Sequence, residues 1–373
     1  MYRSFYVENY RCLTKLELSD LRRVNLVVGR NNMGKTALLE ALFLGGSYNP
    51  QIVAAIDIFR GVQAKRLEFN VDKPPPWSTI FRDFDPKKPI LLQGSTEQGK
   101  HEVQLTAASL DELPPSLMSR LTPFPAKKSE TEKRVSSLSP SHASYARVLK
   151  LVYKDAGGTG THFLIMEPQF TPQLTLAVSI EPPPPPPPFQ TVYISAPHIT
   201  NIEEDANRFS KLQVEKRTHL LLDALRIIEP RLKSIYLALF NGEAMLHGDI
   251  GEKRLIPLPL MGAGTARIAS IVLAMSEAAG GVLLIDEIEN GLHHSVLEKF
   301  WEVIGKTAQE FKVQIFATTH SLECIHAAHK AFLKQQDYDF ALYRLDRKEE
   351  TVCAVRYDRG TLEAAIEMEL EVR

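Results

Sequence analysis

Apolar residues occur in short runs along most of the chain, at spacings that alternate between those of strands and those of helices. Residues 1–18 alternate well enough for two short strands joined by a turn near Asn9. The apolar run Val24–Gly29 suits a buried strand, and residues 35–46 repeat apolar positions at helical spacing before ending on two glycines, which predicts a helix. A further helix is expected over residues 51–65, before an irregular stretch punctuated by proline.

Five runs between about residues 90 and 180 have strand character, and they predict an antiparallel sheet built into the domain. The runs are ILLQGS, HEVQLTAA, YARVLKLVYK, THFLIMEP and LTLAVSIE. Residues 110–141, rich in Ser, Pro and Lys, predict a flexible loop, with a binding arm as the alternative. The unbroken proline run 182–188 predicts a polyproline II rod, acting as a stiff spacer or, alternatively, as a ligand for a proline-reading partner.

The second half of the chain returns to an alternation of strands and helices. Thr191–Ser195 is expected to be a buried strand, and two or three amphipathic helices are expected over about 200–240, one of them including residues 219–240. Residues 337–373 predict a β-hairpin and a short helix. No internal repeat is visible.

Composition restricts the class of protein. The chain has 373 residues, 44% of them hydrophobic, with a formal net charge of −1, so no global positive field attracts it to nucleic acid. Its cysteines, Cys12, Cys324 and Cys353, are scattered without metal-ligand spacing and are expected to be reduced thiols. We find neither a signal-peptide core nor a membrane-spanning apolar run, and we expect a soluble, cytoplasmic protein without a membrane partner.

The stretch GRNNMGKT, Gly29–Thr36, has the spacing G-x-x-x-x-G-K-[ST] of a P-loop. It lies between the predicted strand and helix, so bound phosphates would meet the N-terminus of that helix. Lys35 is expected to reach the terminal phosphates and Thr36 to hold Mg²⁺. The backbone that surrounds the phosphates belongs to Gly29, Asn31, Asn32, Met33 and Gly34, and the ligand is expected to be ATP.

The run GVLLIDEIENGLHH supplies acids for the same site. An apolar strand, Val282–Ile285, is followed directly by Asp286 and Glu287. We expect Asp286 to orient Mg²⁺ and Glu287 to polarise the attacking water, because phosphoryl transfer depends on positioning and charge neutralisation. The pattern predicts Mg²⁺-dependent hydrolysis of ATP to ADP and phosphate.

Two further segments are expected to reach the phosphates. The strand in VQIFATTHS ends at His320, and ligands bind at the carboxyl ends of parallel strands, so His320 should face Lys35 and Glu287. In LPLMGAGTARIAS, small residues open an apolar helix, which makes a second exposed helix N-terminus suited to phosphate. The residues of this loop expected at the nucleotide are Gly262, Gly264 and Thr265.

The motifs NYRCL, GRNNMGKT, LIDEIENGLHH and FATTHS occur in an order that resembles the ABC-type ATPase heads of the SMC/RecF-like and OLD (overcoming lysogenisation defect) branch, AAA ATPases associated with the Abi (abortive infection) proteins. The resemblance covers roughly residues 1–48 and 190–330. It implies a homodimer that encloses ATP, in which the loop Gly262–Thr265 of one copy caps the γ-phosphate held by Lys35 of the other. Asn290, Gly291 and His293 would lie at the dimer seam.

The chain also departs from these relatives. Ser195 and Ala196 stand where such heads place a Gln that touches Mg²⁺, and MGAGT replaces a Ser-Gly-Gly-Gln core. The segment between Ser195 and Gly262 is too short for a long coiled coil, and no Toprim nuclease domain is expected. We therefore predict a P-loop α/β fold of the ABC-type head class, with an inserted antiparallel β region and a small helical lobe. The expected parts are a core at 1–48 and 190–335, with the lobe at about 200–250, an insertion at 49–189 and an extension at 336–373.

Two functions remain open from the sequence. The first is an ATP-driven dimeric switch that controls a separate effector, a Toprim-like or other nuclease, in anti-phage defence. The second is a RecF/SMC-like ATPase of DNA repair or chromosomes that binds DNA directly, against which the near-neutral charge weighs mildly. The motor of a membrane transporter and a small-molecule kinase are disfavoured, because the Gly262 loop has an unusual sequence and no Arg-rich lid is seen.

Overall fold

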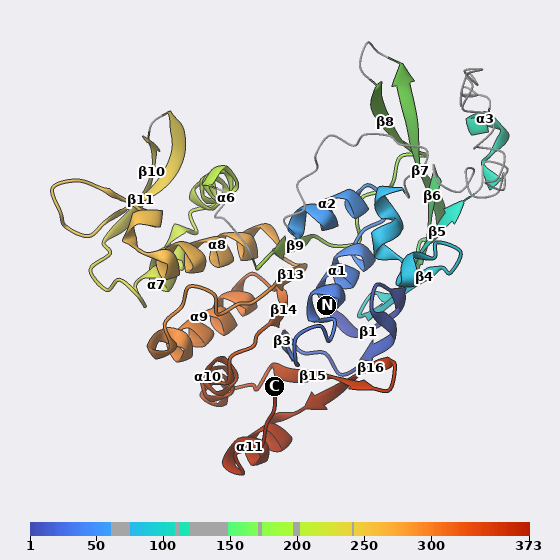
Figure 1. Ribbon diagram of the computed structural model, residues 1–373. Helices are drawn as coiled ribbons and strands as arrows, with labels where there is room; N and C mark the ends of the chain where they lie inside the picture. The colour runs from blue at the N-terminus through green and yellow to red at the C-terminus, as the bar shows by residue number, and fades with distance from the viewer. Residues whose placement is uncertain (61–74, 109–111, 119–147, 171–173, 197–201, 241) are drawn as a thin grey trace.

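Two large sheets of different kinds organise the chain (Figure 1). The computed structural model describes residues 1–60, 75–108, 112–118, 148–170, 174–196, 202–240 and 242–373. The core sheet has the order β16-β15-β3-β14-β13-β9. Its parallel strands are β3 (Val24–Val28), β9 (Thr191–Ile194), β13 (Val282–Ile285), β14 (Gln314–Thr318) and β15 (Phe340–Lys348), and β16 (Thr351–Tyr357) pairs antiparallel with β15.

The second sheet is antiparallel throughout, with the order β2-β1-β4-β5-β6-β7-β8. The five strands predicted between residues 90 and 180 are confirmed, and they continue from the N-terminal hairpin because β4 pairs with β1. Its turn lies at Arg11 and Cys12, slightly later than the position predicted near Asn9. The strands are β1 (Tyr2–Tyr10), β2 (Leu13–Leu18), β4 (Ile90–Thr96), β5 (Gly99–Ala108), β6 (Val148–Asp155), β7 (Gly158–Phe170) and β8 (Leu174–Glu181).

Helix α1 (Lys35–Gly45) lies between the two sheets and contacts β1 and β4 on one side and β13 and β14 on the other. The strands of the core sheet are apolar on both faces because both faces are covered. Leu283 and Ile285 pack into one hydrophobic cluster with the helices of the far side. Val282 and Leu284 pack into the other with α1 and the antiparallel sheet.

The far face of the core sheet is covered by helices of the second half of the chain (Figure 1). They are α6 (Ile202–Val214), α7 (Thr218–Leu225), α8 (Ala263–Glu277), α9 (Leu297–Glu310), α10 (Leu322–Leu333) and α11 (Arg359–Glu367). Most have a buried apolar face and an exposed opposite face, which is the pattern of an amphipathic surface helix. Helix α8 differs, because α6 and α7 pack against it and it is buried from Thr265 to Ser276.

The helix predicted through residues 219–240 is wrong beyond Leu225. Pro230 lacks an N–H and cannot continue a helix. The next residues form strand β10 (Ser234–Phe240), which pairs with β11 (Glu243–Asp249), and β12 (Ile256–Pro257) completes a three-stranded sheet. The predicted helical lobe is therefore a mixed lobe of helices and a β-hairpin.

The segment after α1 contains a helix, α2 (Ile52–Phe59), and two 3-10 turns, η1 (Pro76–Ile80) and η2 (Arg82–Phe84). The predicted helix 51–65 is seen as α2, and its part beyond residue 60 lies outside the described residues. Most of the predicted flexible loop 110–141 also lies outside them, apart from the short helix α3 (Pro115–Met118) and its neighbours.

The prolines at 182–188 connect β8 to β9 without forming a helix or strand, and most of their side chains are exposed. Such a connection fits a spacer between the two sheets. The predicted C-terminal hairpin and helix are confirmed as β15, β16 and α11. Within the described ranges, no helix is long and apolar enough to cross a bilayer.

Candidate active site

The P-loop has the conformation that phosphate binding requires. Gly29 and Gly34 have φ values of 139° and 89°, and a Cβ on Gly29 would lie 2.7 Å from the carbonyl oxygen of Leu345 on β15. Only glycine fits such a position without strain. Helix α1 begins at Lys35, with no side-chain hydrogen bond at its N-cap, so its N-terminus can receive an anion.

Lys35 is buried, and its Nζ donates to the carbonyl oxygens of Gly29 at 2.6 Å and Arg30 at 3.1 Å. Burial lowers the pKa of Lys35, while the charges of Asp286 and Glu287 act in the opposite direction. The ammonium group is thus held within the loop by carbonyl oxygens, and phosphate oxygens offer it stronger, charge-assisted bonds.

A chain of hydrogen bonds connects the P-loop to the two neighbouring strands. Thr36 Oγ1 donates to Asp286 Oδ2 at 2.9 Å, and Thr318 Oγ1 donates to Asp286 Oδ1 at 2.5 Å. Thr318 Oγ1 also accepts from the backbone N–H of Glu287 at 2.8 Å. The parallel order of β3, β14 and β13 brings these groups together, because their carboxyl ends share one edge of the sheet.

Glu287 takes a left-handed conformation, with φ 49°, at the end of β13. Its Oε1 lies 3.1 Å from His320 Nε2, and its Oε2 accepts from Asn290 Nδ2 at 2.7 Å. The backbone N–H of His320 donates to Glu289 Oε1 at 2.9 Å. A non-glycine residue in this conformation, fixed by partners on both carboxylate oxygens, is typical of a functional site.

These side chains open into a cavity of about 570 Å³, a size usual for cofactor sites. The predicted residues that line it are Asn31, Asn32, Gly34, Lys35, Thr36, Asp286, Glu287 and His320. Met33 instead packs against the hydrophobic cluster around α1, and Gly29 contributes the carbonyl that Lys35 contacts.

Arg11, Cys12, Arg60 and Phe84 also line the cavity, and the sequence pattern did not point to them. They come from the β1–β2 turn, the residue after α2 and the turn η2, which fold against α1 from distant parts of the chain. Arg11 and Cys12 belong to NYRCL, one of the motifs that carry the family resemblance, and this motif could have pointed to the turn. Arg60 and Phe84 lie in no recognisable motif.

The second predicted phosphate loop does not line this cavity. Gly262 has φ 123° and is exposed, α8 starts directly after it, and Thr265 is buried. A Cβ on Gly264 would lie 3.1 Å from the carbonyl oxygen of Gly291, so the loop packs against the turn that follows the acids. Asn290, Gly291 and His293 are exposed on the same surface, which we call the signature surface, defined as residues 262–265 and 290–293.

Arg267 connects the signature surface to the acids, and the sequence did not single it out. It is buried on the first turns of α8, and its Nη2 donates to the backbone oxygens of Asp286 at 3.0 Å and Glu287 at 3.2 Å. Burial lowers its pKa, while the charge of Glu289 acts most strongly in the opposite direction. A shift of α8 would therefore move the backbone that carries Glu287.

The oxygen donors fit magnesium. Thr36 and Asp286 offer a hydroxyl and a carboxylate, and Mg²⁺ in nucleotide sites takes few protein ligands together with phosphates and water. The described part of the chain contains no cluster of three or more His, Cys, Asp or Glu that could hold a metal ion. Ser195, at the position of the expected Gln, follows β9 at the edge of the core sheet.

Comparisons with known proteins agree with this geometry. A protein of Helicobacter pylori named "ATP/GTP phosphatase" is 24% identical over 387 positions, covering 99% of both chains. An uncharacterised protein of Methanocaldococcus jannaschii is 42% identical over 65 residues, which are 17% of this chain and 57% of that protein.

Solved structures with a similar chain path include an SMC head bound to the C-terminal winged-helix domain of ScpA, with a TM-score of 0.49 at 11% identity, covering 98% of this chain and 99% of that one. The SMC head domain of Thermotoga maritima gives a TM-score of 0.40 at 12% identity, covering 96% and 99%.

The family model described as "AAA domain, putative AbiEii toxin, Type IV TA system" matches residues 24–325, which include the P-loop, the acid pair and His320. The match covers most of the chain, and the predicted P-loop α/β fold is present in the structure. The chain therefore belongs to this AbiEii-type AAA family, and it is an ATPase.

Proposed function

We propose that the protein is a dimeric, ATP-driven switch that controls a separate effector in anti-phage defence. The observation that carries this proposal is the division of the site. The cavity holds the P-loop and both acids, whereas the signature surface is exposed and lies outside the cavity. A nucleotide bound in the cavity would therefore gain its remaining contacts from a second copy of the chain.

Each residue in the cavity has a role in this proposal. Lys35 and the P-loop amides bind the β- and γ-phosphates, and Thr36 and Asp286 would hold Mg²⁺ between them. The ion would neutralise charge that develops on the transferred phosphoryl group. Glu287 orients the attacking water and accepts its proton, and His320 holds the Glu287 carboxylate and faces the terminal phosphate.

The second copy completes the site in trans. Its Gly262–Thr265 loop would place the N-terminus of α8 on the γ-phosphate, and its Asn290 and His293 would contact the seam. ATP binding then closes the dimer and hydrolysis opens it, so the nucleotide state is converted into a change of assembly. A ligand held between two copies stabilises the closed form only while its γ-phosphate is present.

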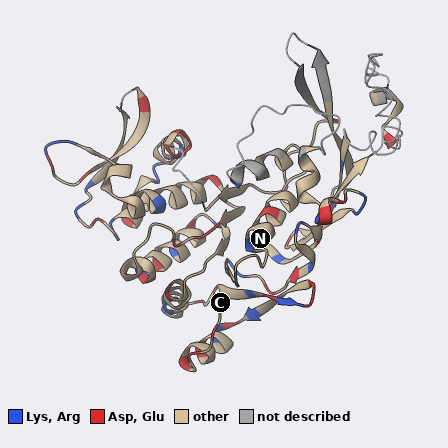
Figure 2. Ribbon diagram, in the orientation of Figure 1, with Lys and Arg blue, Asp and Glu red and all other residues tan. Residues whose placement is uncertain are grey.

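The defence role rests on the family description, which names a toxin of a Type IV toxin–antitoxin system. We propose that the switch acts through a separate partner, and that this partner is a nuclease. The alternative, direct binding of DNA in the RecF manner, has less support from charge. Lys and Arg are interspersed with Asp and Glu over the ribbon (Figure 2), and the formal net charge is −1.

The test is capture of tagged Glu287→Gln protein from its native cells with ATP, beside the matched variant Lys35→Ala, which cannot hold the nucleotide. We expect a nuclease-like protein in fixed ratio with Glu287→Gln only. Its nuclease activity, measured with the purified proteins, should change with the ATP-loaded switch. Nuclease-sensitive DNA without such a protein would instead support the RecF-like function, and equal capture by both variants would contradict a nucleotide-dependent switch.

A further inference from the structure

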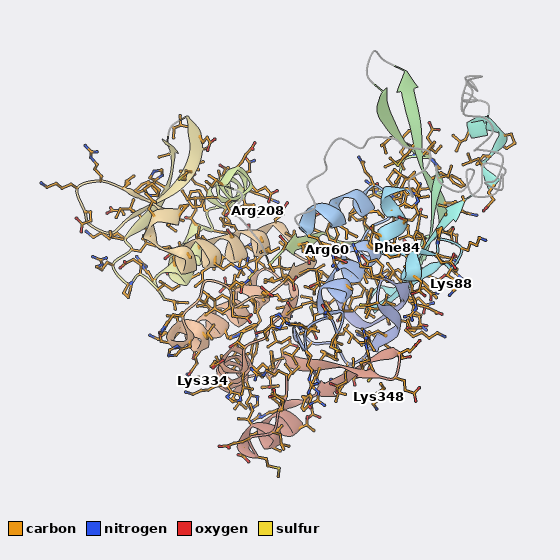
Figure 3. All side chains as sticks on the ribbon, in the orientation of Figure 1. Arg60, Phe84, Lys88, Arg208, Lys334 and Lys348 are labelled. Atoms are coloured by element: carbon orange, nitrogen blue, oxygen red, sulfur yellow. The ribbon has the colours of Figure 1, made fainter. Side chains whose placement is uncertain are left out.

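Part of the cavity lining has no role in the proposed chemistry. Besides the P-loop and the acids, the cavity is lined by Arg11, Cys12, Arg60 and Phe84, and by neighbours on η1 and η2 that include Asp83. Figure 3 labels Arg60 and Phe84, which come from separate segments beside α1. A nucleotide bound by its phosphates must also place its nucleoside, and these residues line the same cavity as the P-loop.

Arg11 and Arg60, which line this part of the cavity, are both held by the carboxylate of Glu40. Glu40 lies on α1 with a fully buried side chain, and its carboxylate receives Arg60 Nε at 2.6 Å and Arg11 Nε at 2.9 Å. Tyr10 donates to the same carboxylate at 3.1 Å. One negative charge is thus shared by two guanidinium groups, and each guanidinium has five N–H donors. The cluster keeps a net positive charge beside the cavity.

Phe84 is an exposed aromatic ring on an anchored turn. Its side chain is 68% exposed, although Ile80 and Phe81 on the same segment are buried. The backbone N–H of Arg11 donates to the Ile80 oxygen at 2.9 Å, and Arg82 donates to Thr14, so the segment is fixed to the N-terminal hairpin. A large apolar ring that is exposed to water and lines the cavity offers a face for stacking.

The backbone at this turn is unusual as well. Asp83 and Phe84 both have positive φ, at 55° and 56°. This conformation is uncommon for a residue as large as phenylalanine, and such residues concentrate at ligand sites. Phe81 and Phe84 both line the cavity, but Phe81 is buried in the hydrophobic core and Phe84 presents an exposed ring.

We propose that Phe84 is the stacking platform for the base of the bound nucleotide, beside the guanidinium wall that Glu40 holds. This inference rests on the proposed nucleotide site and adds the nucleoside end to it. Stacking on an aromatic face tolerates different bases, because every base has a π-face. Stacking alone therefore does not distinguish one purine from the other, and ATP and GTP should both bind.

Stacking away from the reacting phosphate contributes equally to the bound ground state and the transition state. We therefore expect Phe84→Ala to raise KM and Kd for ATP and for GTP by roughly tenfold, with kcat within about twofold of the parent. Phe84→Tyr should restore binding. Tripolyphosphate, which has no nucleoside, should bind Phe84→Ala as it binds the parent.

The experiment is calorimetric titration of the parent, Phe84→Ala and Phe84→Tyr with ATP, GTP and tripolyphosphate, together with steady-state kinetics. Tyr236→Ala, which removes an exposed aromatic ring outside the cavity, is the matched control. Phe84→Trp adds an optical signal that should change with ATP and not with tripolyphosphate, since Trp77 and Trp301 are buried.

Two results would overturn the assignment of Phe84. One is unchanged ATP affinity in Phe84→Ala, and the other is an equal loss of ATP and tripolyphosphate. If Lys35→Ala keeps full ATP affinity, the proposed nucleotide site itself fails. If Lys35→Ala loses ATP while Phe84→Ala does not, only the stacking platform fails.

Discussion

The carboxyl-terminal edge of the core sheet carries the acids and is called the acid edge below. It differs from the signature surface in how many of its side chains already have hydrogen-bond partners. At the acid edge, Thr36, Asp286 and Thr318 are hydrogen-bonded to one another, and both carboxylate oxygens of Glu287 have partners. The signature surface offers small exposed residues and a helix N-terminus, with few side-chain groups of its own. The groups of the first region already meet within one chain, and in our proposal the second region fits another copy of it.

This difference shows where each kind of variant should act. Changes at the acid edge should abolish chemistry in every copy that carries them. Changes on the signature surface should instead be rescued by a copy that is intact there, if the surface acts on a neighbouring site as we propose. The five predictions below follow this distinction, from the largest expected effect to the smallest.

Lys35→Ala should lower kcat/KM for ATP by roughly 10⁴-fold, about 10² of it from lost binding and about 10² from lost charge stabilisation. The Nζ donors that now contact Gly29 and Arg30 are the ones that would exchange to phosphate. Titration with ATP and a phosphate-release assay measure the two parts separately. Unchanged ATP binding would show that the cavity is not the nucleotide site.

Glu287→Gln should lower turnover by roughly 10³-fold while ATP still binds, because the amide cannot accept a proton. The neutral side chain keeps its size and can still accept from Asn290. Single-turnover hydrolysis and retention of labelled ATP measure the effect. Normal turnover would remove Glu287 from the role of base.

Ala263→Glu should lower hydrolysis by roughly 10²-fold and weaken ATP-dependent dimers, because a carboxylate at this exposed position would repel the partner's γ-phosphate. An acidic residue in the first turn favours the helix itself, so folding of α8 should be retained. Ala263→Gln is the uncharged control of the same size.

Mixing Ala263→Glu with Lys35→Ala sharpens the comparison. Each mixed dimer would contain one intact composite site, so activity should recover to about a quarter of the parent value after random exchange. Assembly and hydrolysis are followed together by light scattering and phosphate release. No recovery, with exchange demonstrated, would contradict a site shared between two chains.

His320→Ala should lower turnover by roughly tenfold, the value of a single hydrogen bond to a charged group. Its Nε2 contacts Glu287 and its side chain is 42% exposed, so the substitution should leave the fold unchanged. His320→Gln, which can still donate, should recover part of the rate. Thermal unfolding checks that stability is unaffected in both variants.

The sequence was sufficient to predict which residues meet at the acid edge, because the carboxyl ends of parallel strands lie at one edge of a sheet. Lys35, Asp286 and His320 each follow or flank a predicted strand, so their meeting was a consequence of topology. The sequence pattern predicts a helix where strand β10 forms, because the apolar residues of β10 closely follow those of a helix. Pro230 is the point at which the helix cannot continue. Phe84 could not be predicted, because its place depends on the fold of distant segments.

The strand that carries the P-loop, β3, pairs on one side with β14 and on the other with β15, both from the last part of the sequence. During synthesis, this apolar strand leaves the ribosome long before either neighbour exists. Its edges must stay unpaired until almost the whole chain has been made, because both partner strands, β14 and β15, are made late. Pairing between strands so distant in sequence is also slow. The nascent chain therefore cannot hydrolyse ATP early, and its β3 edge stays open to pairing with other chains while translation continues.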